Sequence, residues 1–267
     1  MNNHLRVTLV QPDTAWQDAP ANRRQLAARF RGLPGHTDLV VLPEMFTTGF
    51  SMQGEELAEP MDGPTIAWMR EESAALGCAI TGSLIVSDAG QQFNRLFWAN
   101  PDGSFAHYDK RHLFRMAREQ QHYAAGSKRL VVEYRGWRVC PMICYDLRFP
   151  VWSRNRDDYD LLLYVANWPA RRRHAWRTLL RARAIENLSY VAGVNRVGVD
   201  GNGVDYSGDS VAIDFAGQPL TDEHDGDAVE TAVLDRQLLV TYRDSFPAHL
   251  DADEFDLKVH QPVASIL

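Results

Sequence analysis

Cysteine is scarce in this sequence, and long apolar runs are missing. The 267 residues include only three cysteines, Cys78, Cys140 and Cys144, without a Cys-x-x-Cys pair. This small odd number excludes a disulfide framework and a zinc knuckle, and it indicates a reducing compartment. No apolar run approaches about 18 residues, and the first residues lack the apolar core of a signal peptide. We therefore expect a cytoplasmic protein that does not enter a membrane.

The chain also lacks an excess of positive charge. Its 28 lysines and arginines are outnumbered by 35 aspartates and glutamates, which gives a net charge of −7. This sign is wrong for a protein whose main partner is a phosphate backbone or an anionic membrane surface. We therefore expect neither nucleic acid nor membrane as a partner.

No repeat, low-complexity tract or linker interrupts the sequence, so nothing marks an internal boundary. With 45% hydrophobic and 24% charged residues, the composition is typical of a globular protein. Residues 1–267 are therefore expected to form a single domain, with an irregular acidic tail from about residue 235. The length is ample for a core without disulfides or a structural metal.

Strand and helix patterns alternate along the chain. Apolar and alternating patterns predict strands at 5–11, 38–42, 78–86, 93–99, 104–109, 130–134, 137–143, 161–166, 190–195, 210–214 and 228–234. Helical spacing predicts helices over about 20–33, 64–77 and 170–187, the second between Pro64 and Gly77. So many strands exceed one comfortable open sheet, and strands that alternate with helices need helices on the outer faces. The predicted fold is a four-layer α-β-β-α sandwich.

Three potentially reactive side chains follow predicted strands, where α/β folds gather their functional groups. Glu44 suits a general base, and Lys110 suits a donor to a developing oxyanion. Cys144 stands at a strand-to-helix junction, where the helix N-terminus would favour the thiolate and the Tyr145 backbone N–H would face an oxyanion. Taken singly, each also fits an ordinary role: a solvated loop glutamate, a surface charge cluster, or a small buried hydrophobe.

Together the three residues suit nucleophilic catalysis. Motifs of serine hydrolases, zinc proteases, P-loop proteins and dinucleotide-binding proteins are missing, and no histidine can be assigned to Cys144 from the sequence. We therefore expect Glu44 to accept the thiol proton and Lys110 with the Tyr145 amide to hold the oxyanion.

The segments around these residues resemble the nitrilase superfamily. They read LPEMF at 42–46, YDKRHLF at 108–114 and ICYDLRFP at 143–150, and the similarity extends through ANWP at 166–169, RARAIEN at 181–187 and YSGDS at 206–210. The resemblance implies a Glu-Lys-Cys thiol hydrolase of carbon-nitrogen bonds on an α-β-β-α fold, without metal or cofactor, which forms a homodimer. It also implies a second glutamate after the lysine, which is assigned to Glu119. Asp209-Ser210 departs from the His-Ser of many relatives.

The segments RHLFRMA at 111–117 and WSRNR at 152–156 are most similar to the omega-amidase branch. Enzymes of that branch release ammonia from 2-oxo acid amides such as 2-oxoglutaramate or 2-oxosuccinamate. The expected substrate is therefore a small amide with a carboxylate, which Arg115 or Arg118 would bind. Arg148 is interpreted instead as an ion-pair partner of Asp146. Nitrile hydrolysis, carbamoyl hydrolysis, acyl transfer and a non-catalytic scaffold remain the alternatives.

Overall fold

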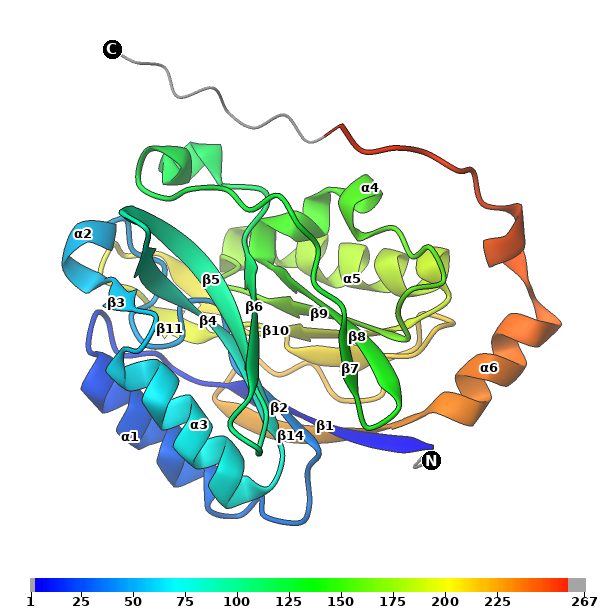
Figure 1. Cartoon of the computed structure of the whole chain (residues 1–267), viewed down its shortest axis with the longest axis horizontal. Coiled ribbons are helices and arrows are strands. Elements are labelled where there is room, and N and C mark those ends of the chain that lie inside the picture. Colours follow the sequence, from blue (N-terminus) through cyan, green and yellow to red (C-terminus); the bar gives the residue numbers. More distant parts are fainter. Residues whose placement is uncertain (1–2, 259–267) are drawn as a thin grey trace.

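The computed structural model describes residues 3–258, in which two packed sheets lie between outer helices (Figure 1). The larger sheet has the strand order β14 (Ala228–Asp235), β1 (His4–Gln11), β2 (Leu39–Val41), β4 (Ala79–Asp88), β5 (Gln91–Ala99) and β6 (Phe105–Asp109), with β3 (Glu59–Pro60) paired to β4. The smaller sheet has the order β13 (Val211–Ile213), β10 (Tyr190–Val194), β9 (Leu161–Val165), β8 (Trp137–Ile143) and β7 (Val132–Tyr134). A separate hairpin joins β11 (Val197–Val199) to β12 (Asp205–Ser207).

The period-two pattern of the strands divides the core into layers. In β2, Leu39 and Val41 belong to the apolar cluster between the sheets, whereas Val40 packs with Leu26 and Phe30 in a second cluster. The strand β9 is buried on both faces, as expected for a parallel strand in the middle of a sheet. Because such strands are held in place by their neighbours, the first residues of the loops that follow them have well-defined positions.

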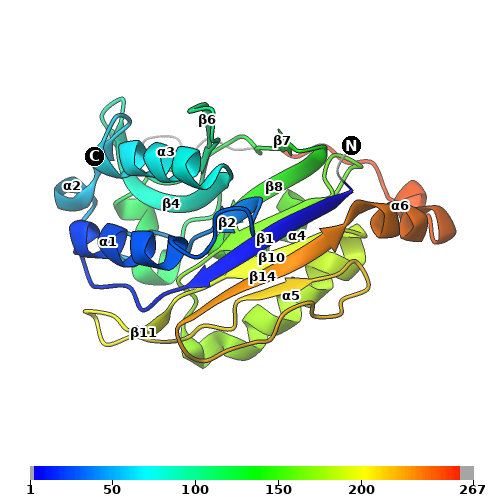
Figure 2. The ribbon, with the colours of Figure 1, turned by 90° about the horizontal axis from the view of Figure 1, so that it is seen from below.

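Helices cover the outer faces of both sheets. Figure 2 shows α1 (Ala19–Phe30) and α3 (Pro64–Leu76) on one side of the molecule and α5 (Arg173–Asn187) on the other. The helix α3 begins at Pro64 and ends at Gly77, whose φ of +67° is the left-handed C-cap that the sequence predicts. The predicted four-layer sandwich is confirmed.

The remaining helices are short. They are α2 (Gly54–Leu57), α4 (Pro150–Ser153) and α6 (Arg236–Ser245), with 3-10 turns η1 (Arg115–Ala117), η2 (Glu119–Gln121), η3 (Cys144–Arg148), η4 (Ala170–Arg172) and η5 (Ala248–Asp251). Among residues 3–258, no helix is both long and apolar enough to cross a membrane.

The helix α6 corrects the expectation of an irregular tail from about residue 235. Its N-terminus is capped by Asp235, whose carboxylate accepts hydrogen bonds from the backbone N–H groups of Gln237 and Leu238. Only Leu239 and Arg243 of this helix are buried, and Arg243 lies 3.1 Å from the carboxylate of Asp160. One buried apolar side chain and one buried arginine do not form the repeating apolar pattern from which a helix is predicted.

Candidate active site

The structure brings four of the predicted site residues together beyond the ends of three strands. Glu44 lies three residues after β2, while Lys110 directly follows β6 and Cys144 directly follows β8. Glu119 comes from η2, in the loop after Lys110. Glu44, Lys110 and Glu119 are at most 1% exposed. The interpretations of Glu44 as a solvated loop residue and of Lys110 as part of a surface charge cluster are therefore wrong.

Lys110 lies between the two glutamates. Its Nζ atom is 2.8 Å from Oε1 of Glu44 and 2.9 Å from Oε2 of Glu119. The Nδ2 atom of Asn94 donates hydrogen bonds to both carboxylates, at 2.8 Å to Glu44 and 3.3 Å to Glu119. The backbone N–H of Phe114 also donates to Glu119, at 2.6 Å. Every polar group of this buried cluster therefore has a partner, as burial of charge requires.

The two carboxylates keep Lys110 charged. Burial lowers the pKa of the ammonium group, but the charges of Glu119 and Glu44 outweigh burial, so the pKa of Lys110 is raised. Burial raises the pKa of Glu119, and Lys110 opposes that shift only in part. A lysine held in this way acts as a fixed cation and not as a free amine.

Cys144 occupies a strained turn at the edge of a cavity. Its φ is +47°, a left-handed conformation that is uncommon for a residue with a side chain. The residue is 9% exposed and lines a cavity of about 240 Å³, together with Lys110 and Tyr145. This is the environment of a reactive side chain that is shielded from bulk water but reachable by a small molecule.

The surroundings of the Cys144 thiol disfavour the thiolate, contrary to the expectation from the sequence. Burial raises the pKa of this thiol well above its usual range, the charge of Glu44 raises it further, and Lys110 opposes both. The helix expected to favour the thiolate is only the 3-10 turn η3, so its dipole is small. A nucleophilic role for this sulfur would therefore require a base, and the carboxylate of Glu44 lies near enough to raise the pKa of the thiol.

Asn167 is a site residue that we did not assign from the sequence. It follows β9, and its backbone N–H donates a hydrogen bond of 2.8 Å to Oε2 of Glu44. Its Nδ2 atom donates to the backbone carbonyl of Glu44 at 2.6 Å. These bonds fix the carboxylate beside the cavity. The sequence held two signals for Asn167: its position just after a buried strand, and its place in ANWP at 166–169, one of the segments that resemble the nitrilase superfamily.

The arginines differ from the prediction. The cavity that contains Cys144 is lined by Arg148, Arg171 and Arg172, and in the described residues neither Arg115 nor Arg118 lines it. Arg115 is exposed and faces a neighbouring open groove, and Arg118 is exposed in a left-handed turn between η1 and η2. This turn directs the loop so that Glu119, and not the arginines, points inward.

Arg148 does not pair with Asp146, so that interpretation is also wrong. Its guanidinium lies over the Trp168 ring, 5.0 Å from the centroid. The Asp146 carboxylate is occupied by donors from Tyr108, His112 and Ile143. Arg148 is therefore free to face the cavity.

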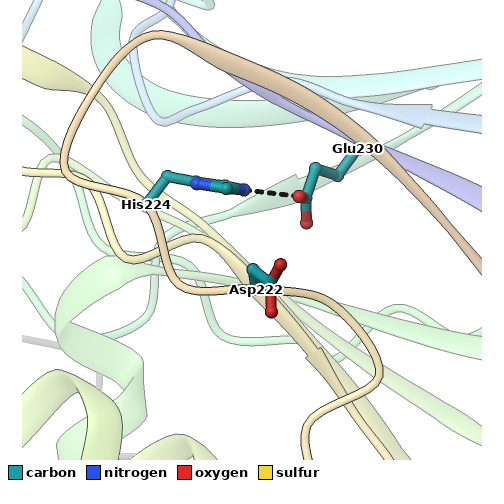
Figure 3. Close-up of side chains that lie close together, drawn as sticks. All are labelled: Asp222, His224 and Glu230. Carbon is teal, nitrogen blue, oxygen red and sulfur yellow. Dashed lines mark hydrogen bonds and ion pairs between the residues drawn. The ribbon is translucent and has the colours of Figure 1, made fainter.

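A second polar cluster lies apart from this cavity. Asp222, His224 and Glu230 point toward one another, and the His224 ring is hydrogen-bonded to Glu230 (Figure 3). None of the three lines the cavity that contains Cys144. Glu230 raises the pKa of His224, as expected for an ion pair at the surface. This cluster is not part of the candidate active site.

Comparison with known proteins identifies the family. The carbon-nitrogen hydrolase family model matches residues 6–244. The chain is 50% identical to the omega-amidase YafV of Yersinia enterocolitica, over 94% of this chain and 98% of the relative, and 33% identical to a 2-oxoglutaramate amidase of Bacillus subtilis, over 81% and 85%. A CN-hydrolase superfamily protein of Xanthomonas campestris, solved with an arsenic adduct in its active site, is 53% identical with a TM-score of 0.94, over 96% of this chain and 99% of that one. The chain therefore belongs to the carbon-nitrogen hydrolase family.

Proposed function

We propose that this protein is an omega-amidase that hydrolyses the terminal amide of small 2-oxo dicarboxylic acid amides, such as 2-oxoglutaramate or 2-oxosuccinamate. The observation that carries the proposal is the charge of the cavity beside Cys144. Arg148, Arg171 and Arg172 line it, and within residues 3–258 none of them forms an ion pair with an acidic side chain. Arginines that lie beside a nucleophile and have no acidic partner in the described residues favour a substrate that brings its own carboxylate.

The walls of the cavity strengthen this preference. Phe50, Phe114 and Trp168 line it beside the arginines, so charge there is only partly hydrated. Nη1 of Arg172 is buried without a hydrogen-bond partner in the described part of the chain. A substrate carboxylate would supply that partner, whereas a neutral substrate would leave it unpaired.

In the first half of the proposed reaction, Glu44 accepts the thiol proton and the Cys144 sulfur attacks the amide carbon. The oxyanion that forms accepts hydrogen bonds from Lys110 Nζ and the Tyr145 backbone N–H. When the carbon-nitrogen bond breaks, Glu44 returns the proton to the nitrogen, ammonia leaves, and a thioester remains on Cys144. Glu119 positions Lys110, because both of its carboxylate oxygens accept hydrogen bonds from the ammonium group, at 3.0 and 2.9 Å.

In the second half, water replaces ammonia. Glu44 accepts a proton from the water as its oxygen attacks the thioester carbon, and the same donors hold the oxyanion. The carbon-sulfur bond then breaks, the acid leaves, and the proton passes from Glu44 to the thiolate. One amide and one water are consumed, and one acid and one ammonia are produced.

Several relatives support this assignment. The omega-amidase and the 2-oxoglutaramate amidase resemble this chain over most of its length. The Xanthomonas protein carries its arsenic adduct in the active site, and arsenic compounds bind thiols, which supports a reactive cysteine at the corresponding place.

We further propose a homodimer in the cytoplasm. Exposed apolar side chains support a second copy: Ile185 of α5 is 54% exposed, and Leu238 and Phe246 at α6 are 58% and 56% exposed. The three unpaired cysteines support a reducing compartment. Light scattering coupled to size exclusion tests the dimer, and a monomeric mass would contradict it.

Ammonia release tests the main proposal. The purified protein is assayed with 2-oxoglutaramate, 2-oxosuccinamate, glutamine, asparagine, a fatty amide, a nitrile and a carbamoyl compound. We expect the highest kcat/KM for the two oxo-acid amides and much lower values for fatty amides. A preference for the nitrile or the carbamoyl compound would establish one of those activities instead, and no turnover of any substrate would favour a non-catalytic scaffold.

A further inference from the structure

The buried carboxylate of Asp146 joins the segment that carries Lys110 to the turn that carries Cys144. Its Oδ2 atom accepts hydrogen bonds from the Tyr108 hydroxyl at 2.8 Å and from the Ile143 backbone N–H at 3.1 Å. Its Oδ1 atom accepts from the backbone N–H of His112 at 2.9 Å and lies 2.7 Å from Nδ1 of its ring. Tyr108 and His112 each stand two residues from Lys110, and Ile143 precedes Cys144.

These bonds act on both reacting groups. The bond from the Ile143 N–H to Asp146 closes a short loop around Cys144, whose φ of +47° is kept only if its surroundings hold it. The two bonds from His112 and the bond from Tyr108 fix the backbone on either side of Lys110. The position of the ammonium group relative to the sulfur therefore depends on one carboxylate that touches neither.

His112 is the member of this network that can be changed with least damage. Asp146 is completely buried, whereas the His112 side chain is 23% exposed at the edge of the neighbouring groove. A carboxylate can only accept, so Nδ1 of His112 carries the proton. The ring also stacks on Phe149, with centroids 3.8 Å apart and an interplanar angle of 6°. Substitutions can therefore remove the hydrogen bond to Asp146 and the stacking on Phe149 one at a time.

We propose that His112 is a positioning residue for the carbon-nitrogen hydrolase reaction, acting through the hydrogen bond from its Nδ1 atom to Asp146. This inference rests on the proposed function only in that Cys144 attacks and Lys110 stabilises the oxyanion. It is independent of which amide is the substrate. His112 touches neither the substrate cavity nor the buried Lys110 cluster, so its effect falls on kcat and not on KM.

A matched pair of variants tests the role. His112→Phe keeps an aromatic ring on Phe149 and removes the donor, whereas His112→Asn removes the ring and places an amide nitrogen near the position of Nδ1. We expect His112→Phe to lower kcat by on the order of 10-fold to 100-fold with little change in KM. We expect His112→Asn to recover most of that loss. His122→Phe, an exposed residue of the same groove, is the control and leaves both constants unchanged.

The following outcomes apply if the wild-type enzyme turns over its amide. Three of them would overturn the proposal: an unchanged kcat in His112→Phe, a lower kcat in His112→Asn than in His112→Phe, or a change in KM without a change in kcat. If His112→Phe does not fold, Tyr108→Phe decides, because it removes a donor from the other carboxylate oxygen. A lower kcat with unchanged KM in Tyr108→Phe supports the network, and an unchanged kcat contradicts it. Absence of amide turnover in the wild type would instead count against the proposed function.

Discussion

Nζ of Lys110 lies 2.8 Å from Oε1 of Glu44, although the two residues stand 66 positions apart in the sequence. Both side chains are buried, and the second carboxylate, that of Glu119, completes the environment of the ammonium group. One cation thus compensates two buried acids. The stability of the fold and the proposed reaction both involve these three side chains, and the two contributions can be tested separately.

Lys110→Met should destabilise the fold by about 3–5 kcal/mol, because it leaves two buried carboxylates without a cation. The loss should grow with pH. Without Lys110 the pKa of Glu119, already raised, rises further, and an acid with a raised folded pKa loses stability as the pH rises through that value. Urea unfolding of the wild type and the variant at about pH 5 and about pH 8 measures the loss of unfolding free energy at each pH. Lys128→Met, at an exposed position, is the control, and an equal loss at both pH values would contradict the prediction.

Lys110→Arg should not restore activity. The position is completely buried between two carboxylates, and the planar guanidinium needs more room and different donor directions than an ammonium group. We expect a loss of transition-state stabilisation of about 2.7–4 kcal/mol, the scale of a missing oxyanion donor. Steady-state ammonia release measures it, and a borohydride-reduced substrate adduct on Lys110 would show that the amine reacts instead.

Glu44→Gln should lower kcat by about 10²-fold to 10⁴-fold, the range for loss of a general base. Gln is nearly the same size and keeps an oxygen that can accept from Lys110 or from the Asn167 N–H, so the fold should survive. Single-turnover assays should show slow formation of the thioester. Glu133→Gln, at an exposed position, is the control, and wild-type turnover in Glu44→Gln would remove Glu44 from the mechanism.

The sequence was informative where a strand ends. The buried runs at 38–42 and 137–143 predict both a strand and the places of Glu44 and Cys144, whereas Lys110 follows the edge strand β6, in which only Tyr108 is buried. Once the family resemblance was included, Glu119 could be assigned as well. The polar contacts of these side chains could not be predicted, because they involve residues on other strands or at their ends, such as Asn94 in β5 and Asn167 after β9.

The arginines that line the cavity could not be predicted from the sequence, and the reason is physical. Arg115 and Arg118 are near Lys110 in sequence, but a left-handed residue at position 118 turns the loop and directs them away from the cavity. Arg171 and Arg172 reach the cavity from η4, a turn whose direction is set by packing of α5 on the smaller sheet. Side-chain direction in loops follows such tertiary contacts, which no local pattern encodes.

Cys144 should be alkylated before the other two cysteines. Cys78 and Cys140 are completely buried, and burial raises the pKa of their thiols to about 11 and about 12. The Cys144 thiol also has a raised pKa, but it lines the cavity beside a base that can accept its proton. Peptide mapping after brief treatment with iodoacetamide checks the order, and earlier modification of Cys140 would contradict it.

Arg172 should determine the preference for a substrate carboxylate. It is half-buried, its Nη1 atom has no partner in the described residues, and Arg148 and Arg171 lie at the same cavity. Repulsion among these guanidinium groups is relieved when an anion binds between them, since burial, Arg171 and Arg148 all lower the pKa of Arg172. Arg172→Met keeps an apolar stem of similar reach and removes the charge.

We expect Arg172→Met to raise KM for 2-oxoglutaramate by about 10-fold to 100-fold, the scale of one charge-assisted hydrogen bond of about 1.5–3 kcal/mol. Hydrolysis of a neutral fatty amide should change by less than about threefold, because such a substrate makes no use of the charge. Arg115→Met is the matched control, since Arg115 faces the neighbouring groove, and it should leave both substrates unaffected. If Arg115→Met raises KM for the oxo-acid amide while Arg172→Met does not, the carboxylate binds on the Arg115 side, and the specificity that we derive from the cavity beside Cys144 is wrong.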